Sequence, residues 1–340
     1  MTDSGSSRVT IYDVAAEAGV AISTVSRVLN NSSEVSDATR TRVQDAIRKL
    51  RFEPQRTARS LAQQSTTSLA VALPSATSLF YVELLKGVKD ALRERDIDLL
   101  LCNLGSRDPA ERLQRFLNRG AVGGLLLVSL SVDERLRERL MGLQAPVVLI
   151  GARADGFDSF WWDDPTGARR ATEHLIQLGH RRIGFIAAQT WSESTAPRRA
   201  GYEAALADAG IEASPELIAT GRVEKHAGYS EEAGAEAMQQ LMALDDPPTA
   251  VFASADVQAY GAWSYARDNG IRIPRDVSLI GYDDLKLSRY LDLSTVNQHA
   301  LDTGFRATRR LLDRMSAPSS ERADVEIPLD LVERGSTAAR

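Results

Sequence analysis

The chain has 340 residues, 43% of them hydrophobic, which suits two or three domains with sizeable cores. Its single cysteine, Cys102, excludes a disulfide framework, and four scattered histidines offer no zinc spacing, so no metal or other cofactor is expected. The N-terminus MTDSGSSRVT has no apolar signal core, and no stretch reaches the roughly 18 apolar residues of a membrane span. A cytoplasmic protein without membrane contact is therefore expected.

The charge is distributed unevenly along the chain. Residues 1–64 carry nine Lys and Arg against seven Asp and Glu, a balance of +2, whereas the whole chain carries −5 and the remainder therefore −7. Seven of the basic residues lie within residues 40–59. A basic head on an acidic body fits nucleic-acid binding, although an ordinary solvated helix face explains the charge alone equally well.

Residues 9–31, VTIYDVAAEAGVAISTVSRVLNN, contain two short apolar-periodic stretches that meet at Gly19. Asp13 is expected to begin the first helix, and Gly19 to end it in the left-handed conformation. A second helix is predicted from Ile22 to Leu29, with Val25 and Val28 on its inward face. Two short helices joined by a glycine-containing turn form a helix-turn-helix unit, whose second helix fits the DNA major groove.

A third helix is predicted after Ser36 and Asp37, which form a capping signal. Its apolar positions Val43, Ile47 and Leu50 complete a small core, and Pro54 is expected to stop it. The stretch QRTARSLAQQSTTS, residues 55–68, then predicts a short helix followed by a Ser/Thr/Gln linker.

Several separate motifs closely resemble the LacI/GalR family of transcription regulators, and they occur in the family's order. In the head and linker they are TIYDVAAEAGVAISTVSRVLN, VSDATRTRVQDAIRKL and RTARSLA. In the body they are SLAVALP, GHRRIGFI, RRAGYEAAL, IPRDVSLIGYDD and LSTVNQ. The resemblance therefore covers the whole chain.

The body alternates strand-like runs with longer helical patterns. Its first half contains the strand-like runs 68–74, 98–103, 124–129 and 146–151, and the βα order repeats after residue 165. The predicted fold class is α/β, with two doubly wound parallel subdomains behind a three-helix head. The family resemblance implies a body like that of periplasmic binding proteins, in which the chain crosses between halves near residues 161–164, 296–300 and 325–328.

These patterns divide the chain into three parts. Residues 1–54 are expected to form the DNA-binding domain, 55–67 a hinge helix and linker, and 68–340 an effector-binding and dimerisation domain. Within this last part, the resemblance assigns about 68–162 and 298–326 to an N-subdomain. The C-subdomain takes about 163–297 and 327–340.

The resemblance implies that the second helix reads DNA. Arg27 suits a guanine edge, and Thr24 and Ser26 suit phosphate oxygens. Ala21 stands where the family usually has Ser at the helix cap, which leaves Ser23 as the alternative cap. The hinge implies Leu61 as an apolar wedge in the minor groove. The residues expected to contact DNA are Thr10, Tyr12, Ile22, Ser23, Thr24, Ser26, Arg27, Asn30, Arg59, Ser60 and Leu61.

In doubly wound sheets, ligands bind beyond the carboxyl ends of the strands, so two facing halves form a cleft. Phe80 and Tyr81 follow the first strand and offer flat surfaces for stacking. The resemblance implies that Arg198 of R-x-x-G-Y and Asp283 of G-Y-D-D contact the effector, and their hydrogen bonding favours a sugar, with a nucleobase or nucleoside as the alternative. The expected effector contacts are Phe80, Tyr81, Trp191, Arg198, Ser254, Asp283 and Gln298.

Two positions of the expected cleft also depart from the family pattern. The family often has Asn where this chain has Ala255 and Asp where it has Gly151, so Ser254 is expected to substitute in part. Trp161 and Trp162 lie near the first crossover and line either the cleft or the hinge.

Other function classes fit the sequence less well. An enzyme needs a nucleophile with its base or paired carboxylates in one cleft, and no G-x-S-x-G, P-loop or G-x-G-x-x-G motif follows the first strand. A solute-binding receptor would explain residues 66–340 but not a basic head. The sequence therefore predicts a non-enzymatic regulator, in the first place a repressor. It would bind palindromic operator DNA as a homodimer and change its DNA affinity with a small effector.

Overall fold

The structure, a computed structural model, describes residues 9–29, 32, 34–52, 68–105, 108–118, 122–317 and 321–340. It divides the chain into two compact units, Met1–Thr66 and Thr67–Arg340. Four of the expected DNA contacts, Asn30, Arg59, Ser60 and Leu61, lie outside the described residues. Across the described parts, none of the helices is long and apolar enough to cross a membrane.

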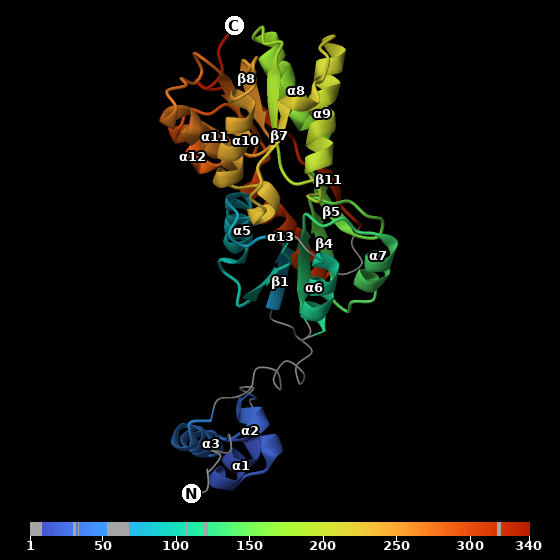
Figure 1. Cartoon of the computed structure of the whole chain (residues 1–340). Coiled ribbons are helices and arrows are strands. Elements are labelled where there is room, and N and C mark those ends of the chain that lie inside the picture. Colours follow the sequence, from blue (N-terminus) through green and yellow to red (C-terminus); the bar gives the residue numbers. More distant parts are fainter. Residues whose placement is uncertain are drawn as a thin grey trace, which may run out of the picture. The chain divides into compact units, whose positions relative to one another are not determined.

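Three helices build the described part of the first unit: α1 (Ile11–Ala18), α2 (Ile22–Leu29) and α3 (Asp37–Leu50) (Figure 1). Their apolar faces meet in one small core around Val14, Val25, Val28 and Val43. Gly19 takes the predicted left-handed conformation, with φ 63°, and ends α1. The helix-turn-helix prediction is therefore confirmed.

The predicted helix ends differ in three details. Helix α1 begins at Ile11, so Asp13 is its third residue and not its first. The Asp13 carboxylate caps the helix by accepting hydrogen bonds from the Thr10 amide at 2.8 Å and the Thr10 hydroxyl at 2.7 Å. Ser23 lies inside α2 rather than at its cap. Helix α3 already ends at Leu50, where Arg51 turns left-handed with φ 52°.

A six-stranded sheet and its helices form the first half of the body, named here the N-lobe. Every pairing is parallel, in the order β11-β5-β4-β3-β1-β2. One sheet face packs against α5 and α13 and the other against α6 and α7. In chain order the elements are β1 (Ser68–Leu73), α5 (Leu79–Leu92), β2 (Asp98–Asn103), α6 (Pro109–Leu117), β3 (Gly124–Val128), α7 (Glu134–Met141), β4 (Val147–Ile150), β5 (Asp158–Trp161), α13 (Ala300–Ser316) and β11 (Asp324–Glu326).

The second half, the C-lobe, has a four-stranded parallel sheet in the order β7-β6-β8-β9 and an antiparallel pair, β10 with β12. Helices α8 and α9 cover one face of the larger sheet, and α10 and α11 the other (Figure 1). Its elements are α8 (Asp164–Gln177), β6 (Ile183–Ala187), α9 (Thr195–Asp208), η1 (Pro215–Leu217), β7 (Ile218–Thr220), η2 (Lys225–Gly228), α10 (Glu231–Met242), β8 (Ala250–Ala253), α11 (Asp256–Asp268), β9 (Ser278–Ile280), α12 (Lys286–Tyr290), β10 (Thr295–Asn297) and β12 (Asp330–Val332).

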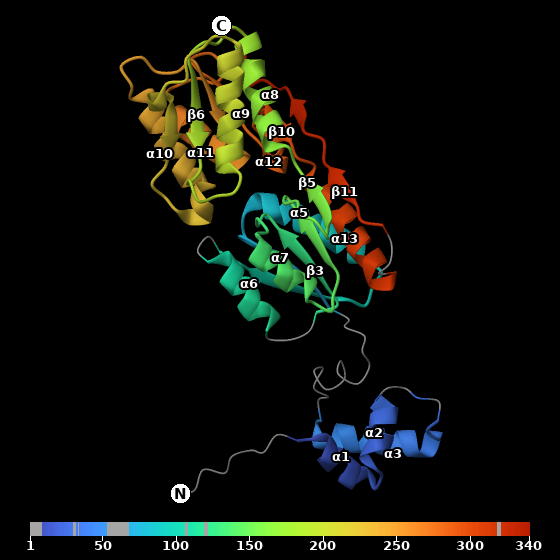
Figure 2. The same cartoon turned by 90° about the vertical axis from the view of Figure 1, so that its right-hand side faces the viewer.

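Three short segments join the lobes. They lie between β5 and α8, between β10 and α13, and between β11 and β12. Figure 2 shows β5 and β11, which pair in parallel, running together into this junction. The prediction of two doubly wound parallel sheets is confirmed, whereas the short strands β5, β7, β10, β11 and β12 and the helix α10 were not predicted.

Candidate functional site

A cavity of about 600 Å³ lies between the two lobes, within the range of roughly 300–1,000 Å³ that is usual for ligand sites. Its N-lobe wall comes from the start of α5, the loops after β3 and β4, and the end of β5. Its C-lobe wall comes from the loops after β6, β8 and β9 and the first turns of α8 and α9. The cavity therefore lies where the carboxyl ends of both parallel sheets meet, as doubly wound folds lead one to expect.

The buried guanidinium of Arg198 is the centre of the C-lobe wall. Its Nε donates to Asp164 Oδ1 at 2.9 Å, and its Nη1 donates to the backbone carbonyl of Ser254 at 2.6 Å. Its Nη2 reaches Gln298 Oε1 at 3.3 Å, and its Cζ lies 3.9 Å from the centre of the Tyr282 ring. These contacts hold the guanidinium in one orientation and leave two of its five N–H groups for other partners.

Asp283 lies beside this group and is also buried. Its Oδ1 accepts a hydrogen bond from Gln298 Nε2 at 2.5 Å. Burial raises the pKa of Asp283 well above its ordinary value, although the charge of Arg198 acts in the opposite direction. This carboxyl therefore keeps its proton to a higher pH than an exposed aspartate, and a protonated carboxyl can both donate and accept.

Aromatic side chains supply the apolar part of the wall. Phe80 meets Trp162 edge to face, with 5.7 Å between ring centres, and Trp162 Nε1 donates to the backbone carbonyl of Gln298 at 2.7 Å. Trp161 Nε1 donates to Asp324 Oδ1 at 2.9 Å, and Arg153 stacks over the Trp161 ring. The aromatic wall is thereby fixed to strand β11 and to the segment between β10 and α13.

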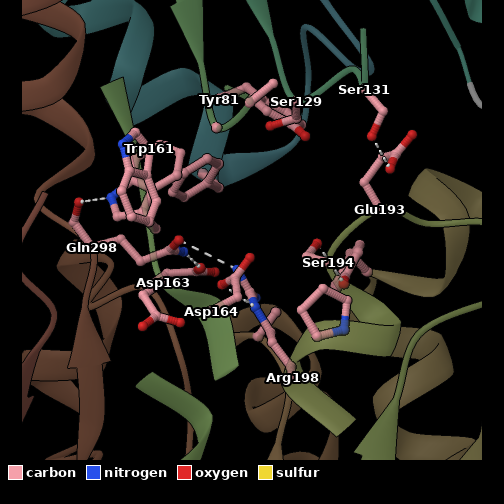
Figure 3. Close-up of a pocket in the computed structure, with 18 of the residues that line it drawn as sticks. Tyr81, Ser129, Ser131, Trp161, Asp163, Asp164, Glu193, Ser194, Arg198 and Gln298 are labelled. Atoms are coloured by element: carbon pink, nitrogen blue, oxygen red, sulfur yellow. Dashed lines mark hydrogen bonds and ion pairs between the residues drawn. The ribbon is translucent and has the colours of Figure 1, made fainter. Parts of the chain in front are cut away.

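The lobes also contact each other directly at the edge of the cavity. Ser131 of the N-lobe donates to Glu193 Oε2 of the C-lobe at 2.6 Å, and Figure 3 shows this bond closing one side of the space. Ser75 and His226 make a second cross-lobe hydrogen bond, with 2.8 Å between Oγ and Nδ1. The two lobes therefore touch at two places beside the cavity, Ser131 with Glu193 and Ser75 with His226.

Five of the seven expected effector contacts line this cavity: Phe80, Tyr81, Arg198, Asp283 and Gln298. Trp191 lines a smaller neighbouring cavity instead. The structure brings Ser254 to neither cavity, because its side chain is fully buried and its hydroxyl donates to Gln258 Oε1 at 2.8 Å. The expectation that the Ser254 hydroxyl replaces a missing ligand contact is corrected, since only its carbonyl serves the site, by holding Arg198.

Several lining residues were not singled out from the sequence. Asp164, Ser129, Ser194 and Tyr229 line the cavity, and Figure 3 shows Arg198, Asp164 and Gln298 together on one side of it, opposite Tyr81 and Ser129. Asp164 was accessible to sequence reasoning, because it opens α8 directly after the first crossover. Nothing in the sequence pattern marks Tyr229, which lies in a loop after η2.

At position 151, where the family often has Asp, neighbouring side chains fill the space around Gly151. Gly151 has φ 72°, and a Cβ built there would lie 3.0 Å from the Trp162 ring and 3.2 Å from Ser129 Oγ. Trp162 and Ser129 therefore occupy the space that a side chain at this position would need. Among the described residues, no group of three His, Cys, Asp or Glu side chains is arranged to hold a metal ion.

The head exposes polar and aromatic side chains on α1 and α2. Thr10, Ile22, Ser23 and Arg27 are exposed, and Thr24 and Ser26 are partly exposed. Tyr12 has 67% of its surface accessible, which is unusual for a tyrosine with no role outside its own small domain. The expected DNA contacts that the structure describes therefore lie on the outside of the three-helix core.

A helix-turn-helix head with an outward-facing second helix, attached to a two-lobed body with a polar cavity, defines a class of ligand-responsive DNA-binding proteins. Residues 10–55 match the family described as bacterial regulatory proteins, lacI family, and residues 172–337 match the periplasmic binding protein-like domain. The chain is 32% identical to the HTH-type transcriptional repressor PurR of Mannheimia succiniciproducens, over 96% of this chain and 98% of that protein. It is 33% identical to catabolite control protein A of Priestia megaterium, over 97% and 99% of the two chains.

Solved structures agree with these relatives. A transcriptional regulator CelR–cellobiose complex has a TM-score of 0.68 and 33% identity, covering 97% of this chain and 100% of that one. The lac repressor dimer bound to operator and the anti-inducer ONPF has a TM-score of 0.75 and 27% identity, covering 98% and 100%. The chain belongs to the LacI family of bacterial regulatory proteins, and it is a transcriptional repressor with a ligand-binding domain.

Proposed function

We propose that this repressor binds a palindromic operator as a homodimer, and that a neutral sugar in the cavity between the lobes controls its operator affinity. The observation that carries the proposal is the linked group Arg198, Gln298 and Asp283. Arg198 offers two uncommitted N–H groups, and Asp283 offers a buried carboxyl beside them. Such a paired set of donors and acceptors suits the adjacent hydroxyls of a sugar ring.

The balance of charge favours a neutral ligand. Arg198 is paired with Asp164, and Arg153 is paired with Asp324, so neither lining cation is available to an anionic ligand without breaking an ion pair. Two structurally similar regulators contain sugars, cellobiose in one and ribose in the other. A nucleobase or nucleoside is the second candidate, because the same wall carries the aromatic residues Phe80, Tyr81, Trp161 and Trp162.

Each of the three parts of the chain has its own role in this proposal. Residues 1–54 bind the operator in the cytoplasm, and residues 68–340 bind effector and pair. Residues 55–67, the predicted hinge, lie outside the described residues and transmit the response of the body in this scheme. A ligand that contacts both lobes stabilises one lobe arrangement relative to others, and operator affinity then shifts by the coupling free energy, typically ~1–3 kcal/mol. The protein acts in this scheme by binding rather than by catalysis.

Pairing through the N-lobe is supported by apolar side chains on its outside. Leu101 on the edge strand β2 is 48% exposed, and Leu79, Leu100, Leu301 and Phe305 are exposed as well. An exposed edge strand with apolar side chains is a recognised route to association. Light scattering after gel filtration should therefore give the mass of a dimer, and Leu101→Asp should shift the protein toward monomer. A monomeric wild type would contradict this part of the proposal.

The central proposal is tested by effector screening on the full chain. Thermal unfolding is followed against a panel of sugars, nucleobases and nucleosides, since a ligand at 100 times its dissociation constant adds about 2.7 kcal/mol. A stabilising sugar is then titrated into the complex with fluorescent operator DNA. A sugar that changes operator affinity supports the proposal, whereas stabilisation and DNA response by nucleobases alone would replace the sugar by the second candidate.

A further inference from the structure

A second cavity of about 290 Å³ adjoins the first and also lies between the lobes. The N-lobe contributes the segment after β1 from Pro74 to Ser78, the end of β2 from Asn103 to Gly105, and the loop after β3. The C-lobe contributes two loops, one around Trp191 and one around His226. This smaller cavity is named here the side chamber, and the 600 Å³ cavity the main chamber.

Six residues line both chambers and so form the boundary between them: Ser78, Tyr81, Ser129, Glu193, Ser194 and Tyr229. Five of the six carry hydroxyl groups, which donate and accept hydrogen bonds in either direction. Ser194 and Tyr229 lie 3.0 Å apart on the C-lobe side, and burial raises the pKa of Tyr81 on the N-lobe side, so its phenol stays protonated. The boundary therefore suits a ligand that extends through both chambers and has oxygen atoms where it passes these hydroxyl groups.

Trp191 gives the side chamber a flat apolar wall. Its side chain is 48% exposed, and its indole makes no hydrogen bond to any described residue. The loop that carries it is fixed, because Ser192 N and Thr195 Oγ1 both donate to the backbone carbonyl of Gln189 at 3.0 Å. An exposed tryptophan ring on a fixed loop presents a large rigid surface with a free N–H at one end.

The second C-lobe loop, around His226, is held in an unusual backbone conformation. His226 and Ala227 have φ values of 52° and 57°, and Gly228 follows with φ 86°. Left-handed non-glycine residues are uncommon, because they cost free energy and persist only where the surrounding structure imposes them. Here they place His226 against Ser75, where Nδ1 and Oγ are 2.8 Å apart and Nε2 has no partner among the described residues. The histidine thus offers a second polar group to the side chamber.

We propose that the effector is a two-unit neutral glycoside, such as a disaccharide, with one ring in the main chamber and the second ring against Trp191 in the side chamber. This inference rests on the proposed sugar effector and narrows it. A single sugar ring in the main chamber would bind the Arg198–Gln298–Asp283 group and leave the side chamber unoccupied by ligand. The glycosidic oxygen of a two-unit ligand would cross the hydroxyl-lined boundary.

The test is isothermal titration calorimetry of the full-length protein with disaccharides and the monosaccharides that compose them. The disaccharides are cellobiose, maltose, lactose and melibiose, and the monosaccharides are glucose and galactose. At least one disaccharide is expected to bind tenfold or more tightly than either of its monosaccharides, which corresponds to about 1.4 kcal/mol. Trp191→Ala should weaken disaccharide binding by about tenfold and leave monosaccharide binding within twofold. Trp191→Phe, which keeps a flat ring, should retain most of the affinity, and Tyr290→Ala, outside both chambers, should change neither ligand.

The outcomes separate the two proposals. Equal affinity for a monosaccharide and its disaccharides, or equal weakening of both by Trp191→Ala, overturns the two-chamber ligand and leaves the sugar effector standing. If no sugar of the panel binds and a nucleoside stabilises the protein, the sugar effector itself fails and the two-unit glycoside fails with it. A tenfold preference for a disaccharide that is lost in Trp191→Ala supports both.

Discussion

Gln298 Nε2 donates a hydrogen bond to Asp283 Oδ1 at 2.5 Å, and this contact joins the cavity wall after β9 to the segment that connects β10 with α13. The backbone carbonyl of the same Gln298 accepts from Trp162 Nε1 at 2.7 Å, and Trp162 lies in the segment between β5 and α8. Gln298 therefore lies in one of the three connections between the lobes and contacts a second one. A ligand that changes the bonding of Asp283 acts where the lobes are joined.

Asp283→Ala should uncouple the effector from operator binding. The variant loses a buried polar contact worth ~1.5–3 kcal/mol to the ligand, so effector affinity should fall roughly ten- to hundredfold. Operator affinity without effector should stay at the wild-type value, because Asp283 lies in the body and not in the head. Fluorescence anisotropy of labelled operator, with and without effector, measures both quantities.

The matched control for this variant is Asp292→Ala. Asp283 and Asp292 both have positive φ values, 128° and 53°, but Asp292 is exposed and lies outside both chambers. Its substitution should leave the effector response intact. If Asp283→Ala responds to effector as wild type does, Asp283 is not a ligand contact, and if it loses operator binding as well, its role is in folding.

Arg27→Ala should weaken operator binding by ~1–3 kcal/mol and relax the preference for one base pair in each half-site. The guanidinium is exposed on α2 and lies 3.6 Å from Glu34, a surface pairing weak enough to be exchanged for a base edge. Arg48→Ala on α3, whose side chain pairs with Asp45, is the matched control and should not change base preference. Equal losses on operator and on random DNA would assign Arg27 to a phosphate instead.

The sequence was sufficient for the parts of the fold that have strong local patterns. The helix-turn-helix and the strands β1, β3 and β4 follow from periodicity, and the family motifs indicated Arg198 at the start of a helix and Asp283 after a strand. The short strands β5, β7, β10, β11 and β12 do not follow from periodicity, because each includes polar residues and lacks a continuous apolar run like that of β4, so their pairing is decided by tertiary contacts. The leucines of β2 suggest a buried strand, yet Leu100 and Leu101 are exposed because β2 is the edge of its sheet.

The candidate site shows the same limit at the level of single side chains. Ser254 and Asp283 both follow strands of the C-lobe sheet, but Ser254 turns its hydroxyl toward Gln258 inside the lobe. Which of two successive residues points into a cleft depends on where the strand ends, and sequence reasoning places such ends only to within a few residues. Trp191 was expected in one cleft, and only the structure divides that cleft into two chambers.

Gly261→Ala should strongly destabilise the C-lobe. Helices α10 and α11 cross closely, and a Cβ built at Gly261 would lie 1.8 Å from the carbonyl oxygen of Glu231. Because the obstacle is backbone, one helix must move, and the free energy of unfolding should fall by about 3 kcal/mol or more. Urea unfolding measures the change. Gly142→Ala is the control, since its Cβ would meet nothing closer than 3.4 Å, and a similar loss there would show that the close crossing is not the cause.

The free energy of unfolding should fall as the pH is lowered from 7.5 toward 6.0. Burial lowers the pKa of His174, His180 and His226 below the ordinary value of 6.5. The unfolded chain therefore takes up protons near pH 6.5 that the folded chain does not yet bind, and lowering the pH favours the unfolded state. Burial raises the pKa of Asp256 to about 6 and that of Asp283 well above its ordinary value, so these two carboxyls take up protons in the folded state first and oppose the effect of the three histidines.

Urea unfolding at pH 7.5, 6.75 and 6.0 measures this dependence, with the histidine effect expected to dominate above pH 6. His226→Gln removes one of the three histidines, so the free energy of unfolding should depend less steeply on pH than in the wild type. Its side chain lies at the edge of the side chamber, where Ser75 is its hydrogen-bonding partner, so the substitution leaves the lobe cores unchanged. A wild-type protein whose stability is constant or rises between pH 7.5 and 6.5 would contradict the prediction. An unchanged slope in His226→Gln would mean that His226 is protonated equally in the folded and unfolded chains.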